Sequence, residues 1–256
     1  ERSGKTSLVR ALLRLSPIES GSITIDCVDI RSVGLTTLRS RLAVVPQDTI
    51  LFKGTWRTNL DPMGEFSDQE ILLAVKLTRL HNWLVRNAPL GLDEPMPSGR
   101  GGIGSEFLAL IGASRAMLRL LQRRSKFLVM DACTCKLDVD SDAILTALLL
   151  RYCRRREVAV LQTSRRVNQV ALYDNVAVLQ GGRIAEHGPA KRLWAKDGAL
   201  RAAARSQNVD ASSLTKAEAV VDRLTSMWSW DVSPQEDSAW SDEFVVSIKK
   251  APSRRR

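Results

Sequence analysis

The sequence predicts an α/β domain in which helices cover a mostly parallel β-sheet and a helical subdomain is inserted into the chain. A glycine-lysine-threonine motif at residues 4–6 stands just before a helical pattern. Short apolar segments at residues 127–130 and 158–161 flank a helical segment at residues 141–152, the order that gives parallel strands with a crossover helix. Residues of about 68–121 have apolar side chains at helical spacing, which predicts the helical subdomain.

The first part of the chain is expected to supply one helix and two strands. Residues 7–16 carry leucines on one helical face and end before Pro17, which cannot continue a helix. Residues 22–27 and 42–45 are short strand candidates in a turn-rich region. The helical interval that follows is interrupted by the Gly/Pro-rich residues 89–104.

The last part of the chain is predicted to close the domain and continue into a tail. Residues 176–179 and 182–186 are typical of a hairpin, with a turn at Gln180 and Gly181 between them. We therefore expect one domain over residues 1–206. Residues 207–256 are polar and rich in Ser, Asp and Glu, which predicts a poorly ordered tail with one helix at residues 214–227 that is dispensable for the fold.

Composition excludes several classes of protein. With 44% hydrophobic residues in a chain of 256, a packed core is expected, yet no apolar stretch approaches the roughly 18 residues of a membrane span. Four cysteines without a C-x-x-C pair and only two histidines favour reduced thiols over a zinc site or a disulfide framework. The net charge of +10 would attract anions, but it is dispersed and lacks interleaved aromatic residues, so no specific nucleic-acid partner is expected.

The motif at residues 4–6 closes a G-x-x-x-x-G-K-[ST] phosphate loop whose first glycine would precede residue 1. Because the sequence opens on Glu1 inside this motif, we expect a fragment of a longer protein. Phosphates need backbone N–H groups, a lysine and a hydroxyl for Mg²⁺, which predicts nucleotide binding by Ser3, Gly4, Lys5, Thr6 and Ser7. Half a motif is also compatible with a chance G-K-T at the start of a helix.

Asp131 follows the apolar segment of residues 127–130 directly. A carboxylate at this place can hold a magnesium ion opposite Thr6 in phosphoryl-transfer enzymes. The simpler alternative is an aspartate that caps a helix after a strand.

Longer segments then resemble a known family in their order and spacing: ERSGKTSLVRALLRL, PIESGSITIDCVDI, LRSRLAVVPQDTILFKGTWRTNLDP and GGRIAEHGP. They resemble the carboxy-terminal nucleotide-binding domain of multidrug-resistance-associated ABC transporters, subfamily C, over nearly all of residues 1–206. The resemblance implies the P-loop NTPase fold of ABC ATPases, with ATP and Mg²⁺ as ligands. It also implies two partners, the transmembrane domains and the other nucleotide-binding domain, and a place at the cytoplasmic face of a membrane through the full transporter.

The resemblance assigns roles to further residues. Gln47 corresponds to the Q-loop glutamine, which in the family touches Mg²⁺ and the attacking water, so Thr6, Gln47 and Asp131 form the expected metal set. Asp138, in TCKLD, matches the D-loop aspartate at the interface with the partner domain, although a plain surface aspartate is the alternative. Ungapped spacing places residues 103–107 over the signature L-S-x-G-Q, with Gly104, Ser105 and Glu106 at its centre.

Several positions depart from the family pattern. Arg2 replaces a loop glycine, a change that the general motif tolerates. Ala132 stands where the family has the glutamate that polarises the attacking water, and Arg165 where it has the switch histidine, so no catalytic residue is intact. Glu106 brings a carboxylate beside the partner's γ-phosphate, which it should repel. Extra residues also lie in RLLQRRSKF, before the strand that ends at Asp131.

Three functional hypotheses follow. The first is an ATP-binding domain of an ABC exporter, which couples ATP to transport, with hydrolysis impaired here. The second is a hydrolysis-competent ATPase domain that uses unusual residues. The third is a non-transporter ABC protein acting on nucleic acid, against which the exporter-like segment TILFKGTWRTNLDP argues.

Overall fold

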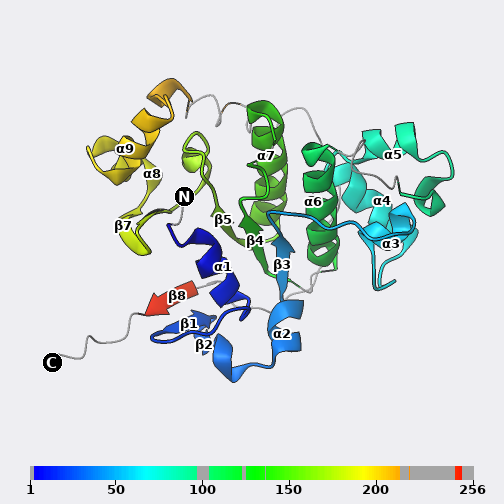
Figure 1. Ribbon diagram of the computed structural model, residues 1–256, viewed down its shortest axis with the longest axis horizontal. Helices are drawn as coiled ribbons and strands as arrows, with labels where there is room; N and C mark the ends of the chain where they lie inside the picture. The colour runs from blue at the N-terminus through cyan, green and yellow to red at the C-terminus, as the bar shows by residue number, and fades with distance from the viewer. Residues whose placement is uncertain are drawn as a thin grey trace.

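The computed structural model describes residues 3–96, 104–122, 125–135, 137–213 and 219, and the backbone of residues 246–249. Its centre is a parallel sheet in the order β3 (Leu42–Val45), β4 (Phe127–Asp131) and β5 (Ala159–Thr163). This confirms the predicted α/β class with a parallel sheet. Both apolar segments expected as strands form neighbouring strands, as Figure 1 shows.

Helices cover both faces of this sheet. On one face, α1 (Lys5–Leu12) packs through Val9 and Leu12 against Phe127 and Val129. On the other face, Leu128 and Met130 join a larger cluster with α6 (Ser105–Leu121) and α7 (Val139–Arg155). Every residue of β4 is buried because successive side chains alternate between two covered faces.

A small antiparallel sheet lies beneath α1 and contains β1 (Ser22–Ile25) and β2 (Val28–Asp29), followed by η1 (Ile30–Ser32) and α2 (Leu35–Ser40). The strand predicted over residues 22–27 ends at Ile25. Asp26 and Cys27 have φ angles of 50° and 62°, and two successive left-handed residues make the tight turn that joins β1 to β2.

The helical subdomain forms a lobe at one end of the molecule (Figure 1). It contains α3 (Trp56–Leu60), α4 (Asp68–Leu77), α5 (His81–Asn87), η2 (Gly91–Asp93) and α6. Side chains of Thr55 and Ser67 cap α3 and α4, each in a reciprocal capping box. The aromatic rings of Trp56 and Trp83 both contact Phe107 on α6, with ring centroids 5.4 and 5.0 Å away, which joins the lobe to α6.

The last part of the described chain contains η3 (Val170–Leu172), the antiparallel hairpin of β6 (Val176–Gln180) and β7 (Arg183–Gly188), and then α8 (Ala190–Ala195) and α9 (Ala199–Ser206). The predicted hairpin therefore forms, with its turn one residue later than expected. Gly181 and Gly182 both have positive φ angles, 55° and 74°, which a two-residue hairpin turn of type I′ requires.

Two further expectations differ from the structure. The first helix begins at Lys5, two residues earlier than predicted, and ends at Leu12 instead of residue 16. It ends early because Arg14 takes a left-handed φ of 50° and its guanidinium donates hydrogen bonds to the carbonyls of Ile30 and Val33. Within the predicted tail, β8 (Val246–Lys249) pairs with β1, so this segment has regular structure. The helix expected at residues 214–227 falls almost wholly outside the described residues.

Candidate nucleotide-binding site

The start of α1 presents the groups that the phosphate-loop prediction requires. Gly4 has a φ of 96°, a left-handed backbone conformation that favours glycine. Lys5 donates from Nζ to Ser3 Oγ over 2.6 Å, and Thr6 is exposed. Gly4 supplies no side-chain acceptor for the first N–H groups of the helix. These donors and the helix dipole suit a phosphate group.

Asp131 ends β4 at the carboxyl edge of the sheet. Its side chain is 7% exposed, and its Oδ1 accepts a hydrogen bond from Thr163 Oγ1 over 2.7 Å. The next residue, Ala132, is also buried, has a left-handed φ of 45°, and donates its N–H to the carbonyl of Thr163. The end of β4 is therefore fixed to the end of β5 by side chain and backbone together.

Gln47 lies two residues beyond β3 and is half-buried. Since Val45 pairs in register with Met130, Gln47 and Asp131 leave the sheet at the same edge. The topology brings these two residues to one side of the sheet, but no described contact joins them.

Arg165, the residue at the switch position, lies in the segment after β5. It shares a cavity of about 630 Å³ with Ser3 and Lys5, lined mainly by β5, β6 and the chain between them. Gln207, at the end of α9, holds this segment by donating to the carbonyl of Arg165 over 2.7 Å and accepting from the N–H of Val167 over 3.1 Å. The fold thus brings three cationic residues, Lys5, Arg165 and Arg166, from distant parts of the chain to one cavity.

The signature-equivalent residues open α6. Gly104 is the residue before the helix, and Ser105 and Glu106 are exposed in its first turn, where the helix dipole favours a carboxylate. Residue 103 lies outside the described residues. A glutamate at position 106 is thus compatible with the helix itself.

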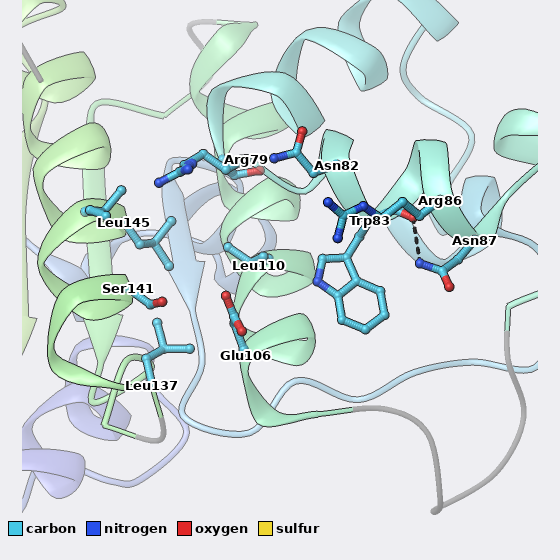
Figure 2. Close-up of a pocket in the computed structure, with 12 residues that line it drawn as sticks. Arg79, Asn82, Trp83, Arg86, Asn87, Glu106, Leu110, Leu137, Ser141 and Leu145 are labelled. Atoms are coloured by element: carbon cyan, nitrogen blue, oxygen red, sulfur yellow. Dashed lines mark hydrogen bonds between the residues drawn. The ribbon is translucent and has the colours of Figure 1, made fainter. Parts of the chain in front are cut away.

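Glu106 also lines a second cavity, of about 500 Å³, between α5, α6 and α7. Figure 2 shows its carboxylate facing Leu137 and Ser141 across the gap, with Arg79 above them. Leu137 and Ser141 flank Asp138, the predicted D-loop residue. The structure therefore brings the predicted signature and D-loop segments to opposite walls of one cavity.

Asp138 acts as the amino-terminal cap of α7. Its Oδ1 accepts hydrogen bonds from the backbone N–H groups of Asp140 and Ser141 over 3.0 and 2.9 Å. Hydrogen bonds from the side chain and the backbone of Ser141 lower the pKa of Asp138 below its usual value. The aspartate is ionised at neutral pH and its orientation is set by α7.

Sequence reasoning missed three residues that organise this edge of the sheet: Thr163, Arg166 and Asp142. Thr163 bonds Asp131, and Arg166 forms an ion pair with Asp142 of 2.8 Å. The signal in the sequence was an acidic residue in the first turn of α7 together with the two arginines that follow β5, which can form an ion pair. It could not be read without knowing that the two loops are neighbours.

The donor set fits MgATP in its chemistry. Thr6, Gln47 and Asp131 offer hydroxyl, amide and carboxylate oxygens, the ligands that Mg²⁺ accepts beside water and phosphate. Over the described part of the chain, no group of three or more His, Cys, Asp or Glu side chains could hold a metal by itself. None of the described helices is long and apolar enough to cross a membrane.

Comparisons with known proteins agree with this geometry. The family profile described as ABC transporter matches residues 3–98. ATP-binding cassette sub-family C member 2 of Rattus norvegicus is 32% identical over 208 residues, which are 81% of this chain and 13% of that protein. ATP-binding cassette sub-family C member 3 of Homo sapiens is 34% identical, covering 79% of this chain and 13% of that protein. ABC transporter C family member 5 of Arabidopsis thaliana is 37% identical, with 75% and 12% covered.

A solved structure is similar as well. The bacterial Atm1-family ABC exporter with ATP bound superposes with a TM-score of 0.70 at 26% identity, covering 81% of this chain and 35% of that one. The chain spans about one eighth of the length of the curated relatives named above. On these grounds the chain carries an ABC transporter domain with the P-loop fold, and it is homologous to members of subfamily C over about four fifths of its length.

Proposed function

We propose that this chain is the carboxy-terminal nucleotide-binding domain of a subfamily C exporter, and that it binds MgATP but hydrolyses it slowly or not at all. A single contrast carries the proposal. The groups that hold the nucleotide and its metal are present at Lys5, Thr6 and Asp131, whereas Ala132 and Arg165 occupy the positions of the groups that handle the attacking water and the γ-phosphate.

Binding is supported by the start of α1 and by charge. Lys5 and Arg165 line one cavity together with Arg166, which is paired with Asp142, and the first turn of α1 offers backbone donors beside Lys5. Mg²⁺, when bound, would neutralise phosphate charge, with Thr6, Gln47 and Asp131 as the residues that hold it.

Impaired hydrolysis is supported by the chemistry of two side chains. The methyl group of Ala132 cannot accept a proton, and loss of a positioned general base typically costs about 10² to 10⁴ in rate. The guanidinium of Arg165 stays protonated and has no acceptor atom, although it can still contact an anion. Hydrolysis thus lacks a base at either position.

Impaired closure is supported by Glu106. Its carboxylate is exposed at the start of α6, where the family places a glycine near the partner's γ-phosphate. Like charges in proximity raise the free energy of the closed state, so the partner's ATP would be held less tightly on this surface.

Partners of the whole transporter are part of the same proposal. Ile50, Phe52 and Met63 are large apolar side chains with exposed fractions of 70, 50 and 79% in the segment after Gln47. Exposed apolar side chains gathered in one segment are typical of a protein contact. We assign this segment to the transmembrane domains, and the surface with Glu106 and Asp138 to the second nucleotide-binding domain.

The test is calorimetric titration of the full chain with MgATP. The variant Lys5→Ala should bind at least tenfold more weakly, a loss of about 1.4 kcal/mol, because it removes the cation at the phosphates. Lys76→Ala, which changes an exposed lysine on α4, is the matched control and should bind as the unmodified chain does. Equal affinities for the Lys5→Ala variant and the unmodified chain would disprove the assignment of the site.

A further inference from the structure

Arg166 connects two loops that leave the sheet at the same edge. From the segment after β5, its Nη1 donates to Asp142 Oδ2 over 2.8 Å and to the carbonyl of Asp138 over 3.4 Å. Its Nη2 donates to the carbonyl of Cys135 over 3.3 Å and to that of Leu137. One guanidinium therefore binds the carboxylate of Asp142 on α7 and three carbonyls of the loop that leads from β4 to α7.

The ion pair at the centre of this contact is largely shielded from water. The side chain of Asp142 is 1% exposed and that of Arg166 25%. Thr146, one turn along α7, lies with its hydroxyl 3.4 Å from both Asp142 Oδ1 and Gln169 Oε1. The carboxylate thus accepts a hydrogen bond from Thr146 besides its pair with the arginine, and removal of either charge would leave the other largely buried without its partner.

The other end of the connection is equally well fixed. The N–H of Arg166 donates to Ser164 Oγ over 3.0 Å, and Gln207 holds the backbone on both sides of it, at Arg165 and Val167. The fixed segment that places Arg165 at the first cavity therefore also carries Arg166, whose guanidinium binds the loop of Leu137 and Asp138.

We infer that Arg166 is a positioning residue that makes the placement of Leu137 and Asp138 depend on the placement of Arg165. Leu137 lines the second cavity opposite Glu106, so the connection joins the two cavities of the candidate site. The dependence on nucleotide rests on the function proposed above, whereas the grip on the loop rests only on the contacts of Arg166. Lysine cannot replace arginine here, because one ammonium cannot fork to the carboxylate and the carbonyls together.

Cys135 provides a reporter inside the gripped loop. Its side chain is half-buried, whereas Cys133 and Cys153 are buried. Burial raises the pKa of both buried thiols to about 12, so they stay protonated and unreactive near neutral pH. Cys27 is exposed and is removed by Cys27→Ser, which leaves Cys135 as the thiol to be labelled with a chromogenic disulfide at pH 7.5.

The experiment compares labelling rates in the Cys27→Ser chain with and without MgATP. Without nucleotide, Arg166→Lys and Arg166→Gln should each raise the labelling rate of Cys135 at least fivefold, because the loop loses its grip. Arg192→Gln, at an exposed arginine of α8, is the control and should leave the rate unchanged. Rates in both Arg166 variants equal to that of the parent chain would overturn the grip.

The nucleotide arm then tests the dependence on Arg165. MgATP should change the labelling rate of the parent chain at least twofold, and this change should vanish in Arg166→Lys while the ATP affinity stays within twofold. A purely structural role would leave the change intact in a folded variant, and Arg166→Lys keeps the charge beside Asp142 so that the chain folds. Unaltered labelling in a parent chain saturated with ATP would refute the connection. Absence of ATP binding would instead refute the proposed function and leave the nucleotide-free comparison to decide the grip.

Discussion

The start of α1 and the carboxyl ends of β4 and β5 serve the same candidate site, but they are held in different ways. Lys5 bonds a neighbour two residues away, and Thr6 and Ser7 are exposed. At the strand ends, Asp131 is buried and bonded to Thr163, 32 residues further along the chain. The side chains at the start of α1 thus make only a local bond or are exposed, whereas Asp131, although also proposed as a metal ligand, is fixed by a hydrogen bond to the neighbouring strand. Substitutions should therefore separate ligand binding from stability.

The largest expected effect is on ATP turnover, and it tests whether the candidate site can be changed into one that hydrolyses ATP. Ala132→Glu, Arg165→His and Glu106→Gly together should raise magnesium-dependent hydrolysis by about 10² to 10⁴, the range supplied by a positioned general base. Ala132 already adopts a left-handed φ with a Cβ atom, so glutamate adds no new backbone strain there. Phosphate release from the purified full chain is the measurement.

The single and double variants of this series are its controls. Ala132→Glu with Arg165→His should recover turnover only in part, because Glu106 still opposes closure and residues acting as a unit are not additive. Hydrolysis by the unmodified chain at about 1 s⁻¹ or faster, as in ordinary enzymes, would contradict the impaired site.

The next effect is on folding and compares the two regions directly. Asp142→Ala should lower the free energy of unfolding by about 3 kcal/mol, because it leaves Arg166 without its counter-charge in a largely buried place. Lys5→Ala should change it by less than about 0.5 kcal/mol, as is usual for a side chain that bonds only a close neighbour along the described chain. Urea unfolding of both variants gives the comparison, and equal losses would show that the two regions are held alike.

The same difference between local and long-range contacts separates the features that could be predicted from the sequence from those that could not. The phosphate loop, the strand that ends at Asp131 and the helical lobe were predicted from local patterns, since a G-K-T before a helix or an apolar run of four residues can be recognised in a short stretch of sequence. The strand predicted over residues 22–27 ends two residues early, at Ile25, and the predicted hairpin turn lies one residue later, at Gly181 and Gly182. Both differences arise because the left-handed φ angles of a hairpin turn are set together with strand pairing.

The network of Thr163, Arg166 and Asp142 could not be predicted, since Thr163 lies 32 residues from its partner Asp131 and Arg166 lies 24 residues from Asp142. Even a correct set of strands does not say which loop carbonyl an arginine will reach. Lys5 begins α1, Gln47 follows β3 and Asp131 ends β4, and their roles at a nucleotide stay predictions, while the contacts that hold them depend on tertiary structure.

A smaller effect is expected at the end of β5. Thr163→Val keeps the size of the buried side chain and removes its hydrogen bond to the Asp131 carboxylate. Loss of one hydrogen bond to a charged group should lower the free energy of unfolding by about 1.5 kcal/mol. Thr163→Ser retains the hydroxyl and should lose less. A Thr163→Val chain as stable as the unmodified one in urea would show that Asp131 is held by other groups.

The smallest effect is a pH dependence at the cap of α7. Hydrogen bonds from Ser141, first from its side chain and then from its N–H, lower the pKa of Asp138 in the folded chain. The unfolded value is about 3.9, so the cap stabilises the fold fully above that pH and loses its contribution as the pH falls through the lower folded pKa. Ser141→Ala removes the larger cause and should move the pKa of Asp138 back toward its usual value, as carboxyl NMR titration would report. Asp138→Asn should remove this component of the acid dependence altogether, because an amide has no proton to gain in that range. If Ser141→Ala leaves the titration of Asp138 where it was, the cap is set by the helix backbone alone, and the loop that Arg166 grips owes its geometry to α7 rather than to this side chain.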